Sequence, residues 1–441
     1  MRFAVITFLI AFVMPHTGPT TPTLESCTDG ITSIAERYVK LVLKIGLYDA
    51  DYVDAYYGPE EWRPKKTGEE ADFELMLAEV QKLRHELSQE MAESCGDDDG
   101  LADRIKFLGK QLISVEARIN YLAGTRLSFD QEANSLYDAQ PPVYSAGYFQ
   151  KQVDRLDEIL PGEGSVSSRL NEFRSQFVIS KDKLDDVFKA AIDEARKRTL
   201  AKIDLPENEN FVVEYVTEKS WSGYNWYKGN SYSLIQINTD LPIYIDRAID
   251  LACHEGYPGH HVFNALLEKH LVRERNWVEF FVYPLFSPQS LIAEGSANYG
   301  IDVAFPGEQR VAFEREVLFP LAGLDPEKAE VYYEVLALLG RLSYSGNEAA
   351  RNYLDGKMTK DQAVDWLVNY SLSSPERSEQ RVRFFEQYRS YVINYNLGRD
   401  MVAEFVESRG GTPENPDKRW EIFTELLSNP HVPSDLTKDS K

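Results

Sequence analysis

Helical periodicity runs through most of the chain and limits the folds that it can adopt. Apolar residues recur three and four positions apart, with charged residues between them. This spacing is typical of amphipathic helices that bury one face. The chain has 441 residues and no internal repeat, so we expect a mainly α fold built as one large domain, residues 27–432. The helical windows are 31–47, 73–93, 101–122, 181–202, 262–269, 288–305, 326–342, 359–370 and 382–409.

One segment, residues 211–241, breaks the helical pattern. It contains runs of β-branched and aromatic residues separated by glycines. Such runs predict a small antiparallel β-sheet. The run at 231–238 ends shortly before a histidine-rich segment, and we expect it to act as an edge strand with which an extended peptide can pair. The alternative is a hairpin that only packs on the helices.

Both ends of the chain differ from its middle. Met1 and Arg2 precede an apolar run, residues 3–14, and then a stretch rich in Thr and Pro. The run is too short to span a membrane and fits a secretory signal peptide. We therefore expect residues 1–26 to be a signal peptide and linker, and the mature protein to be exported; a buried N-terminal helix is the alternative. Residues 433–441 are expected to form a polar tail.

The three cysteines are Cys27, Cys95 and Cys253, an odd number that excludes a disulfide scaffold as the organising principle of the fold. Residues 24–27 read Leu-Glu-Ser-Cys and resemble a lipoprotein acylation box. They lie well beyond the apolar run and include Glu25. We therefore expect export without a lipid anchor on Cys27.

The charge balance excludes two classes of partner. The chain carries 71 acidic and 48 basic residues, which gives a net charge of −23. Such a field repels nucleic acid and anionic lipid, so neither is an expected partner. We also expect no integral membrane span once the signal peptide is removed. Solubility alone is another explanation of the charge.

Three of the seven histidines fall within eight residues, in the segment His254-Glu255-Gly256-Tyr257-Pro258-Gly259-His260-His261. Neutral imidazole is the commonest zinc ligand, and a catalytic zinc takes three protein ligands and keeps one position for water. In the metallopeptidase pattern His-Glu-x-x-His, both histidines lie on one face of a helix and the Glu acts as the base. Here Pro258 stands where the second histidine is expected, so the ordinary spacing fails.

A break in the helix at Pro258 and Gly259 would restore the geometry. In a straight helix His261 would return to the face of His254, but about 10 Å further along the axis, too far to share one ion. Proline removes a helical hydrogen bond and glycine permits unusual backbone angles, so the chain can bend and bring a later histidine back. The spacing leaves both His260 and His261 open as the second ligand. A helix end with packing histidines is the alternative.

Glu294 is the candidate third ligand. It lies 34 positions after His260 (294 − 260), inside the largely apolar helix predicted over 288–305. A buried carboxylate needs a compensating partner, and a metal ion provides one. The alternative is an ordinary surface glutamate. Together with His254, these residues predict a Zn²⁺ cofactor.

Short motifs extend along most of the mature chain in a fixed order. They are DAYYGP at 54–59, LPG at 160–162, YNWYKGN at 224–230, NTDLP at 238–242, the histidine segment at 254–261, EG at 294–295 and NYNLG at 394–398. With these motifs the chain resembles the bacterial family catalogued as domain of unknown function 885. Members are similar to helical zinc metallopeptidases of the angiotensin-converting enzyme, thimet oligopeptidase and thermostable carboxypeptidase type.

The resemblance implies a large helical metallopeptidase-like fold, with zinc bound by His254, His260 and Glu294. It therefore favours His260 over His261. The chain departs from the family's pattern after the ligand Glu. Ser296 stands where the family usually has Trp, and Ile301 where it usually has a second acid, with Asp302 one step further on. Which side chains hydrogen-bond to the ligands and orient them is therefore left open.

The expected activity is zinc-dependent hydrolysis of peptide bonds in short peptides. Glu255 is expected to take a proton from the attacking water and pass it to the leaving amine. Tyr388, Tyr391 and Tyr395 recur at helical spacing, and the resemblance points to Tyr395 as the donor to the oxyanion; an aromatic packing stripe is the alternative. Two other functions stay open: a metal-dependent hydrolase of a non-peptide amide or ester, and a non-catalytic secreted protein with structural zinc.

Overall fold

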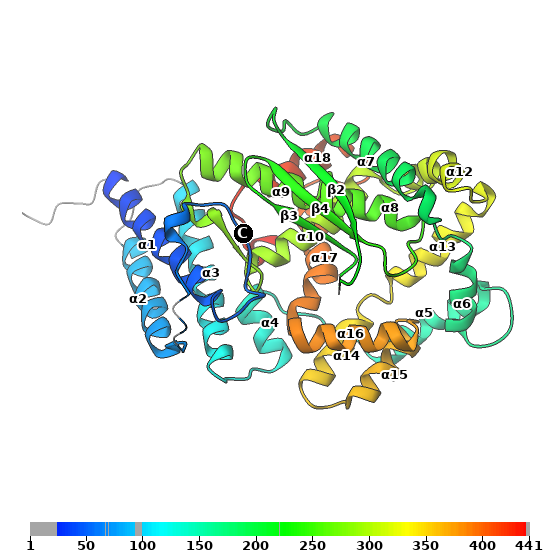
Figure 1. The fold of residues 1–441 in the computed structure, drawn as a ribbon, viewed down its shortest axis with the longest axis horizontal. Coiled ribbons are helices and arrows are strands. Elements are labelled where there is room, and N and C mark those ends of the chain that lie inside the picture. The colour runs from blue at the N-terminus through cyan, green and yellow to red at the C-terminus, as the bar shows by residue number, and fades with distance from the viewer. Residues whose placement is uncertain (1–23, 67, 69, 93–98, 220, 438–441) are drawn as a thin grey trace, which may run out of the picture.

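The computed structural model describes residues 24–66, 68, 70–92, 99–219 and 221–437 (Figure 1). The predicted signal segment falls almost wholly outside the described residues, as does Cys95. Helix α1 (Leu24–Ile45) already includes Cys27, so helical structure begins before the predicted domain boundary. The cysteine therefore lies in the first turns of a helix.

The predicted polar tail, residues 433–441, is wrong over its first four residues. These form a 3-10 helix, Pro433–Leu436, in which Pro433 and Leu436 are buried. The backbone N–H of Ser434 also donates to Asp138 Oδ2 at 3.0 Å. Burial of two apolar side chains holds this segment on the domain despite its polar neighbours.

The mainly α prediction is confirmed, and the apolar windows explain why. In α3 (Asp99–Leu122) a row of apolar residues three and four apart is buried against α1 and α2 (Phe73–Ala92). Figure 1 shows these three helices together at one end of the molecule. Within the described residues, no helix combines the length and apolar character needed to cross a membrane. The buried row of α3 is Ile105, Leu108, Leu112, Val115 and Ile119.

The other helices follow along the chain in short connected segments. They are α4 (Phe129–Tyr137), α5 (Ala146–Ile159), α6 (Val166–Ser175), α7 (Leu184–Leu200), α8 (Asp246–Leu251), α9 (His260–Leu267), α10 (Pro288–Ala304), α11 (Glu308–Phe313), α12 (Phe319–Ala322), α13 (Ala329–Gly340), α14 (Ser345–Leu354), α15 (Lys360–Tyr370), α16 (Pro375–Tyr388), α17 (Ile393–Ser408) and α18 (Pro416–Ser428). The predicted helix over 382–409 is interrupted. Arg389 takes a positive φ of 51°, and a 3-10 turn, Arg389–Val392, separates α16 from α17.

Helices α10 and α17 cross in close contact at the centre of the fold (Figure 1). Two glycines make this approach possible. A Cβ on Gly295 would lie 2.4 Å from the carbonyl carbon of Gly398, and a Cβ on Gly398 would lie 2.6 Å from Leu291 O. Because neither position has room for a side chain, the backbones meet directly. This contact brings Glu294 of α10 next to Tyr391, in the 3-10 turn before α17, and near Tyr395 in the first turn of α17.

The small sheet has three strands in the order β2–β4–β3, with bounds β2 (Asn210–Val216), β3 (Gly223–Tyr227) and β4 (Tyr232–Asn238). Strands β3 and β4 pair antiparallel as predicted, whereas β2 joins β4 in parallel. A second, two-stranded antiparallel ribbon joins β1 (Val53–Tyr56) to β5 (Val282–Pro284).

The expected edge strand at 231–238 is wrong. This segment is β4, the central strand, and it is hydrogen-bonded on both sides. Its backbone groups are therefore already used, and a peptide cannot pair with it. In this sheet, the strands that pair on only one side with a described strand are β2 and β3.

Candidate metal centre

A break between two helices sets the positions of the histidines. Helix α8 continues into a π-helical turn, Ala252–Gly256, which carries His254 and Glu255. The helix then ends, and Gly259 N–H donates to Cys253 O at 2.9 Å. A Cβ on Gly259 would lie only 2.0 Å from His254 O, so a glycine is required there. Helix α9 starts immediately afterwards at His260, which confirms the predicted bend of the chain.

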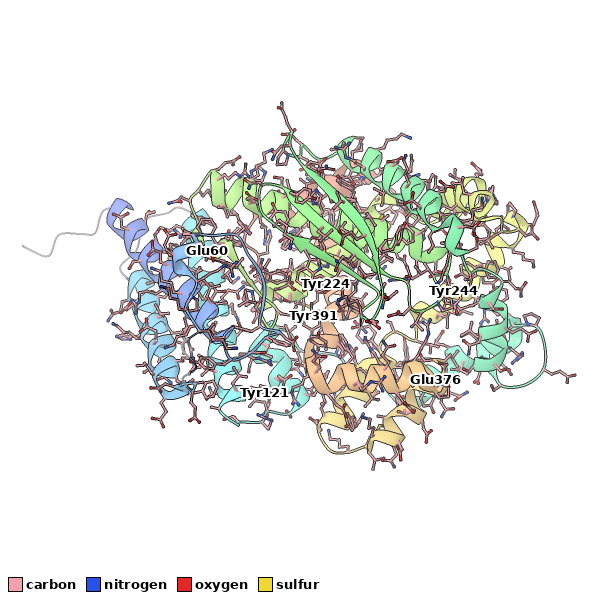
Figure 2. The ribbon with its side chains drawn as sticks, viewed as in Figure 1. Glu60, Tyr121, Tyr224, Tyr244, Glu376 and Tyr391 are labelled. Carbon is pink, nitrogen blue, oxygen red and sulfur yellow. The ribbon has the colours of Figure 1, made fainter. Side chains whose placement is uncertain are left out.

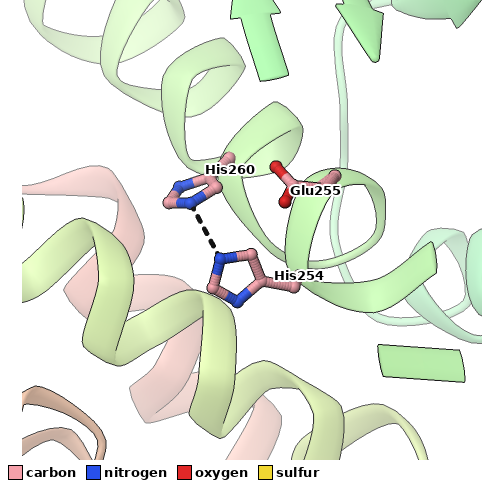
Figure 3. A group of neighbouring side chains, drawn as sticks. All are labelled: His254, Glu255 and His260. Atoms are coloured by element: carbon pink, nitrogen blue, oxygen red, sulfur yellow. Dashed lines mark hydrogen bonds between the residues drawn. The ribbon is translucent and has the colours of Figure 1, made fainter. Parts of the chain in front are cut away.

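Three side-chain atoms from α9, α10 and the π-helical turn converge on one point. His254 Nε2 lies 3.1 Å from His260 Nε2 and 3.2 Å from Glu294 Oε2, and His260 Nε2 lies 3.7 Å from Glu294 Oε2. Two ligands of a tetrahedral zinc with bonds of roughly 2.0–2.1 Å are separated by about 3.3 Å. The three distances match one face of such a tetrahedron. Figure 3 shows the two imidazoles facing each other, with Glu255 beside them.

The hydrogen bonds around His254 fix which of its nitrogens carries the proton. Asn298 Nδ2 donates to Tyr395 O at 2.9 Å, so the amide oxygen of Asn298 is the atom that faces His254 Nδ1 at 3.0 Å. An amide oxygen only accepts, and His254 Nδ1 must therefore be the protonated nitrogen. The lone pair of His254 then lies on Nε2, directed at the point where the other two donors converge.

The carboxylate of Glu294 is divided between two roles. Its Oε1 accepts a hydrogen bond of 2.7 Å from Tyr391 OH, which fixes its orientation. Its Oε2 is buried and has no hydrogen-bond donor among the described residues. A buried carboxylate oxygen without a donor is costly unless a cation compensates it. The donor set of two imidazole nitrogens and one carboxylate oxygen is therefore suited to zinc.

The pKa values of Glu294 and His260 also indicate that this cluster attracts positive charge. Burial raises the pKa of Glu294, but the imidazoles of His254 and His260, which can donate to its Oε2 when they are protonated, outweigh burial and hold that pKa well below its usual range. Burial lowers the pKa of His260, but the bond to Glu294 and the charges of Glu255 and Asp54 raise it to about 9. The site therefore attracts positive charge strongly. A single divalent cation would satisfy this attraction in place of protons on the imidazoles.

Glu255 lies beside the three donors and is itself buried. Ligand atoms of His254, Glu255 and His260 all lie within 4.8 Å of one another. Strand β3 packs against Glu255. Asn225 Nδ2 donates to the backbone oxygen of Glu255 at 2.6 Å, and a Cβ on Gly223 would lie 3.0 Å from Glu255 Oε1. The carboxylate therefore lies beside the point where the donors of His254 and His260 converge.

His261 is turned away from this cluster and fully buried. Its Nδ1 lies 2.9 Å from Ser233 Oγ and its Nε2 lies 3.0 Å from Glu209 Oε2. Both ring nitrogens therefore have partners, and neither faces His254. The geometry places His260, and not His261, beside His254 and Glu294.

The three tyrosines predicted on one side of a late helix divide into different roles. Tyr391 bonds to Glu294, whereas the Tyr395 hydroxyl has no hydrogen-bond partner among the described residues. Burial and the nearby charge of Glu294 raise the pKa of Tyr395 well above its usual range, while Arg381 opposes the shift. Tyr395 therefore stays a neutral phenol that can donate. The ring of Tyr395 packs edge to face on that of Tyr391, with the ring centroids 5.8 Å apart. The predicted aromatic packing therefore accounts for the ring of Tyr395 but not for its hydroxyl.

Three residues around the site were not singled out from the sequence: Asn298, Tyr391 as a partner of Glu294, and Asp54. Asp54, on β1, accepts a hydrogen bond from Tyr224 OH on β3. Burial raises the pKa of Asp54 to about 7, opposed by His260 and reinforced by Glu294 and Glu255. In the view of Figure 2, Tyr224 and Tyr391 both lie near the middle of the molecule. The available signals were the i, i+4 spacing of Glu294 and Asn298 and the place of Asp54 in the motif at 54–59.

The departures from the family's pattern now have a structural outcome. Ser296 Oγ donates to Ala293 O at 3.2 Å within α10, and Asp302 pairs with Arg399 at 2.6 Å. Neither side chain hydrogen-bonds to the three converging donors. The side chains that hydrogen-bond to His254 and Glu294 are Asn298 and Tyr391.

Comparison with known proteins gives no identity. No family model matches the chain, and no curated protein matches it. Among solved structures the chain is similar to a candidate lipoprotein of unknown function from Shewanella oneidensis, with 14% sequence identity and a TM-score of 0.43. The match covers 80% of this chain and 72% of that one. A likeness at this TM-score carries no argument about fold or function.

Proposed function

We propose that this protein is a zinc-dependent hydrolase that cleaves peptide bonds in short peptides. The observation that carries the proposal is the convergence of His254 Nε2, His260 Nε2 and Glu294 Oε2 at 3.1–3.7 Å, with Glu255 beside them. Three protein donors leave one position for water, which is the arrangement of catalytic rather than structural zinc. The resemblance to the domain of unknown function 885 family and the signal-like N-terminus support this proposal and an exported location.

Zinc held by these residues would supply Lewis acidity and a water with a pKa near neutrality. Glu255 then takes a proton from the attacking water and later delivers it to the leaving amine. The Tyr395 phenol, neutral and without a bond of its own, donates to the oxyanion that forms on the substrate carbonyl. Asn298 and Tyr391 keep His254 and Glu294 in position throughout.

Strand β3 is the part of the fold best placed to hold a peptide. Asn238 N–H donates to Ser222 O and Lys228 N–H to Tyr232 O, each at 2.9 Å. Because hydrogen bonding alternates along an antiparallel pair, the backbone groups of Gly223 and Asn225 point away from β4. These two residues also contact Glu255. An extended peptide paired with β3 would therefore run beside the base, which favours a peptide over other amides and esters.

Cleavage should depend on Glu255 while zinc binding should not. We expect Glu255→Gln to retain about one zinc per chain and to lose hydrolysis of denatured casein and short peptides by roughly 10²–10⁴-fold, because an amide cannot accept the proton. Exposed Glu207 provides the matched control, and Glu207→Gln should keep full activity. Zinc content by mass spectrometry and initial cleavage rates decide the matter. Equal rates for both variants would refute the assignment of the base, and a wild type with zinc but no cleavage would favour the structural-zinc alternative.

A further inference from the structure

Arg381 of α16 differs from the other shielded arginines of the molecule. Among the arginines that the structure describes, every other buried or half-buried one pairs with a carboxylate within 4.0 Å. Arg381 is half-buried and makes no ion pair or hydrogen bond with a described residue. In a chain with 71 acidic residues, a shielded guanidinium without an acidic neighbour is an exception.

A row of aromatic rings connects Arg381 to the metal centre. The guanidinium carbon lies 4.8 Å from the centroid of Phe384, whose ring is 4.6 Å from that of Tyr388. Tyr388 lies 6.1 Å from Tyr391, which bonds to Glu294 and packs on Tyr395. Arg381 is also near enough to the Tyr395 phenol for its charge to lower the pKa of that group. The guanidinium is therefore on the Tyr395 side of the site.

Packing explains the position of Arg381 only in part. Stacking on Phe384 and Phe385 stabilises a guanidinium by about 0.5–1 kcal/mol at exposed sites and more when it is desolvated. It leaves all five N–H donors without acceptors among the residues that the structure describes. Burial lowers the pKa of Arg381 and the nearby Tyr395 only partly opposes this, so the free site favours an added anion. The planar fork of a guanidinium fits a carboxylate with two parallel hydrogen bonds.

We propose that Arg381 binds a carboxylate of the substrate peptide, on the side of the metal centre where Tyr395 lies. The carboxylate can come from the C-terminus of a short peptide or from an acidic side chain, and the chemistry of recognition is the same. The identity of the ligand as a peptide rests on the proposed function; the anion site itself does not. Recognition of a C-terminal carboxylate would make the protein a carboxypeptidase or a peptidase of short oligopeptides with free C-termini.

The first experiment compares matched peptides. Penta-alanine with a free C-terminus is compared with its C-terminal amide, and an amidated peptide with one central Glu is compared with the same peptide carrying Gln. The wild type should cleave the carboxylate form of one pair about 10–100-fold better in kcat/KM, the scale of a bidentate charged contact. Arg381→Met should bring that pair within about twofold by removing the fork, whereas Arg377→Met, an equal charge change at an exposed site on the same helix, should not.

Which pair responds identifies the source of the carboxylate. Discrimination in neither pair, or discrimination that survives in Arg381→Met, overturns the proposal. Zinc content and thermal melting of both variants are measured alongside, because loss of either would show damage to the fold instead of loss of a contact.

A second measurement does not depend on hydrolysis. The Arg381 Nε–H resonance, assigned by its loss in Arg381→Met, should shift on titration of the full-length protein with N-acetylglycine and stay unchanged with N-acetylglycinamide. A shift in a protein that cleaves no peptide would keep the anion site and refute only the proposed function. No shift with the carboxylate would overturn the anion site even in an active peptidase.

Discussion

His260 and His261 are adjacent in the sequence, and each lies in a buried cluster with a glutamate and a tyrosine. Around His261, both ring nitrogens have hydrogen-bond partners: Ser233 Oγ faces Nδ1 and Glu209 Oε2 faces Nε2. Tyr257 OH also donates to Glu209 at 2.6 Å. Around His260, imidazole nitrogens face each other and a carboxylate oxygen, with the lone pair of His254 directed inward. The same residue types therefore form a satisfied structural network in one place and an incomplete one in the other. The incomplete network is the one in which a bound cation would supply the missing partner, as we propose.

This difference predicts opposite effects of one substitution at the two neighbouring positions. His260→Gln should weaken zinc binding on the order of 10³-fold, since the free energy of zinc binding of roughly 10–16 kcal/mol is shared among few ligands. His261→Gln should leave the zinc affinity of the folded protein within about threefold and lower its stability by about 1–3 kcal/mol through the lost buried bonds. Competition with a chelating dye measures the first effect and urea unfolding the second. Loss of zinc in His261→Gln with full retention in His260→Gln would move the ligand to His261.

Substitutions of Tyr391 and Tyr395 should also have different effects. Tyr395→Phe should lower kcat/KM by about 10²-fold with unchanged zinc affinity, because its hydroxyl is available only to the reacting group. Tyr391→Phe should instead weaken zinc binding by about 10-fold, because it removes the bond that orients Glu294. Kinetics at saturating zinc, together with zinc affinities, distinguish these outcomes. Equal kinetics for Tyr395→Phe and wild type would remove Tyr395 from the mechanism and leave it as a packing ring.

The network around His261 should show itself in the dependence of stability on pH. Burial raises the pKa of Glu209, but bonds from His261, Tyr257 and Arg196 outweigh it and lower the pKa to about 2. A folded pKa below the ordinary value of about 4.3 means that the stabilisation is complete above that value and is lost as the pH falls toward 2. Glu209→Gln should cost about 2 kcal/mol at neutral pH and flatten the stability profile in that acidic window. Urea unfolding at a series of pH values tests this, with exposed Glu207→Gln as the control that should keep the wild-type profile.

Local patterns in the sequence predicted most of the helices and the core of the site. The window 73–93 became α2 (Phe73–Ala92) and 288–305 became α10 (Pro288–Ala304), because a helix with one apolar face is specified by its own residues. The motif from His254 to His261 predicted the bend at Pro258 and Gly259, because these two residue types interrupt a helix by themselves. The spacing alone did not separate His260 from His261. The resemblance favoured His260, and the structure shows the two side chains in contact with different elements.

Features that depend on distant pairing were not accessible in this way. The central place of β4 follows from the parallel addition of β2, which strand composition does not specify. The break of the predicted helix 382–409 occurs at Arg389, a residue type that seldom takes a positive φ. Asn298 and Asp54 became candidates only when α10, α17 and the β1–β5 ribbon came together around the histidines.

The central claim is that three lone pairs from His254, His260 and Glu294 hold one zinc ion. The most direct test is an anomalous difference map, recorded at the zinc absorption edge, from crystals of the full chain prepared with zinc. We expect a single peak at roughly 2.0–2.2 Å from His254 Nε2, His260 Nε2 and Glu294 Oε2, with His261 still bonded to Ser233 and Glu209. A peak at His261, or a map without a peak in which His254 bonds directly to Glu294, would contradict it.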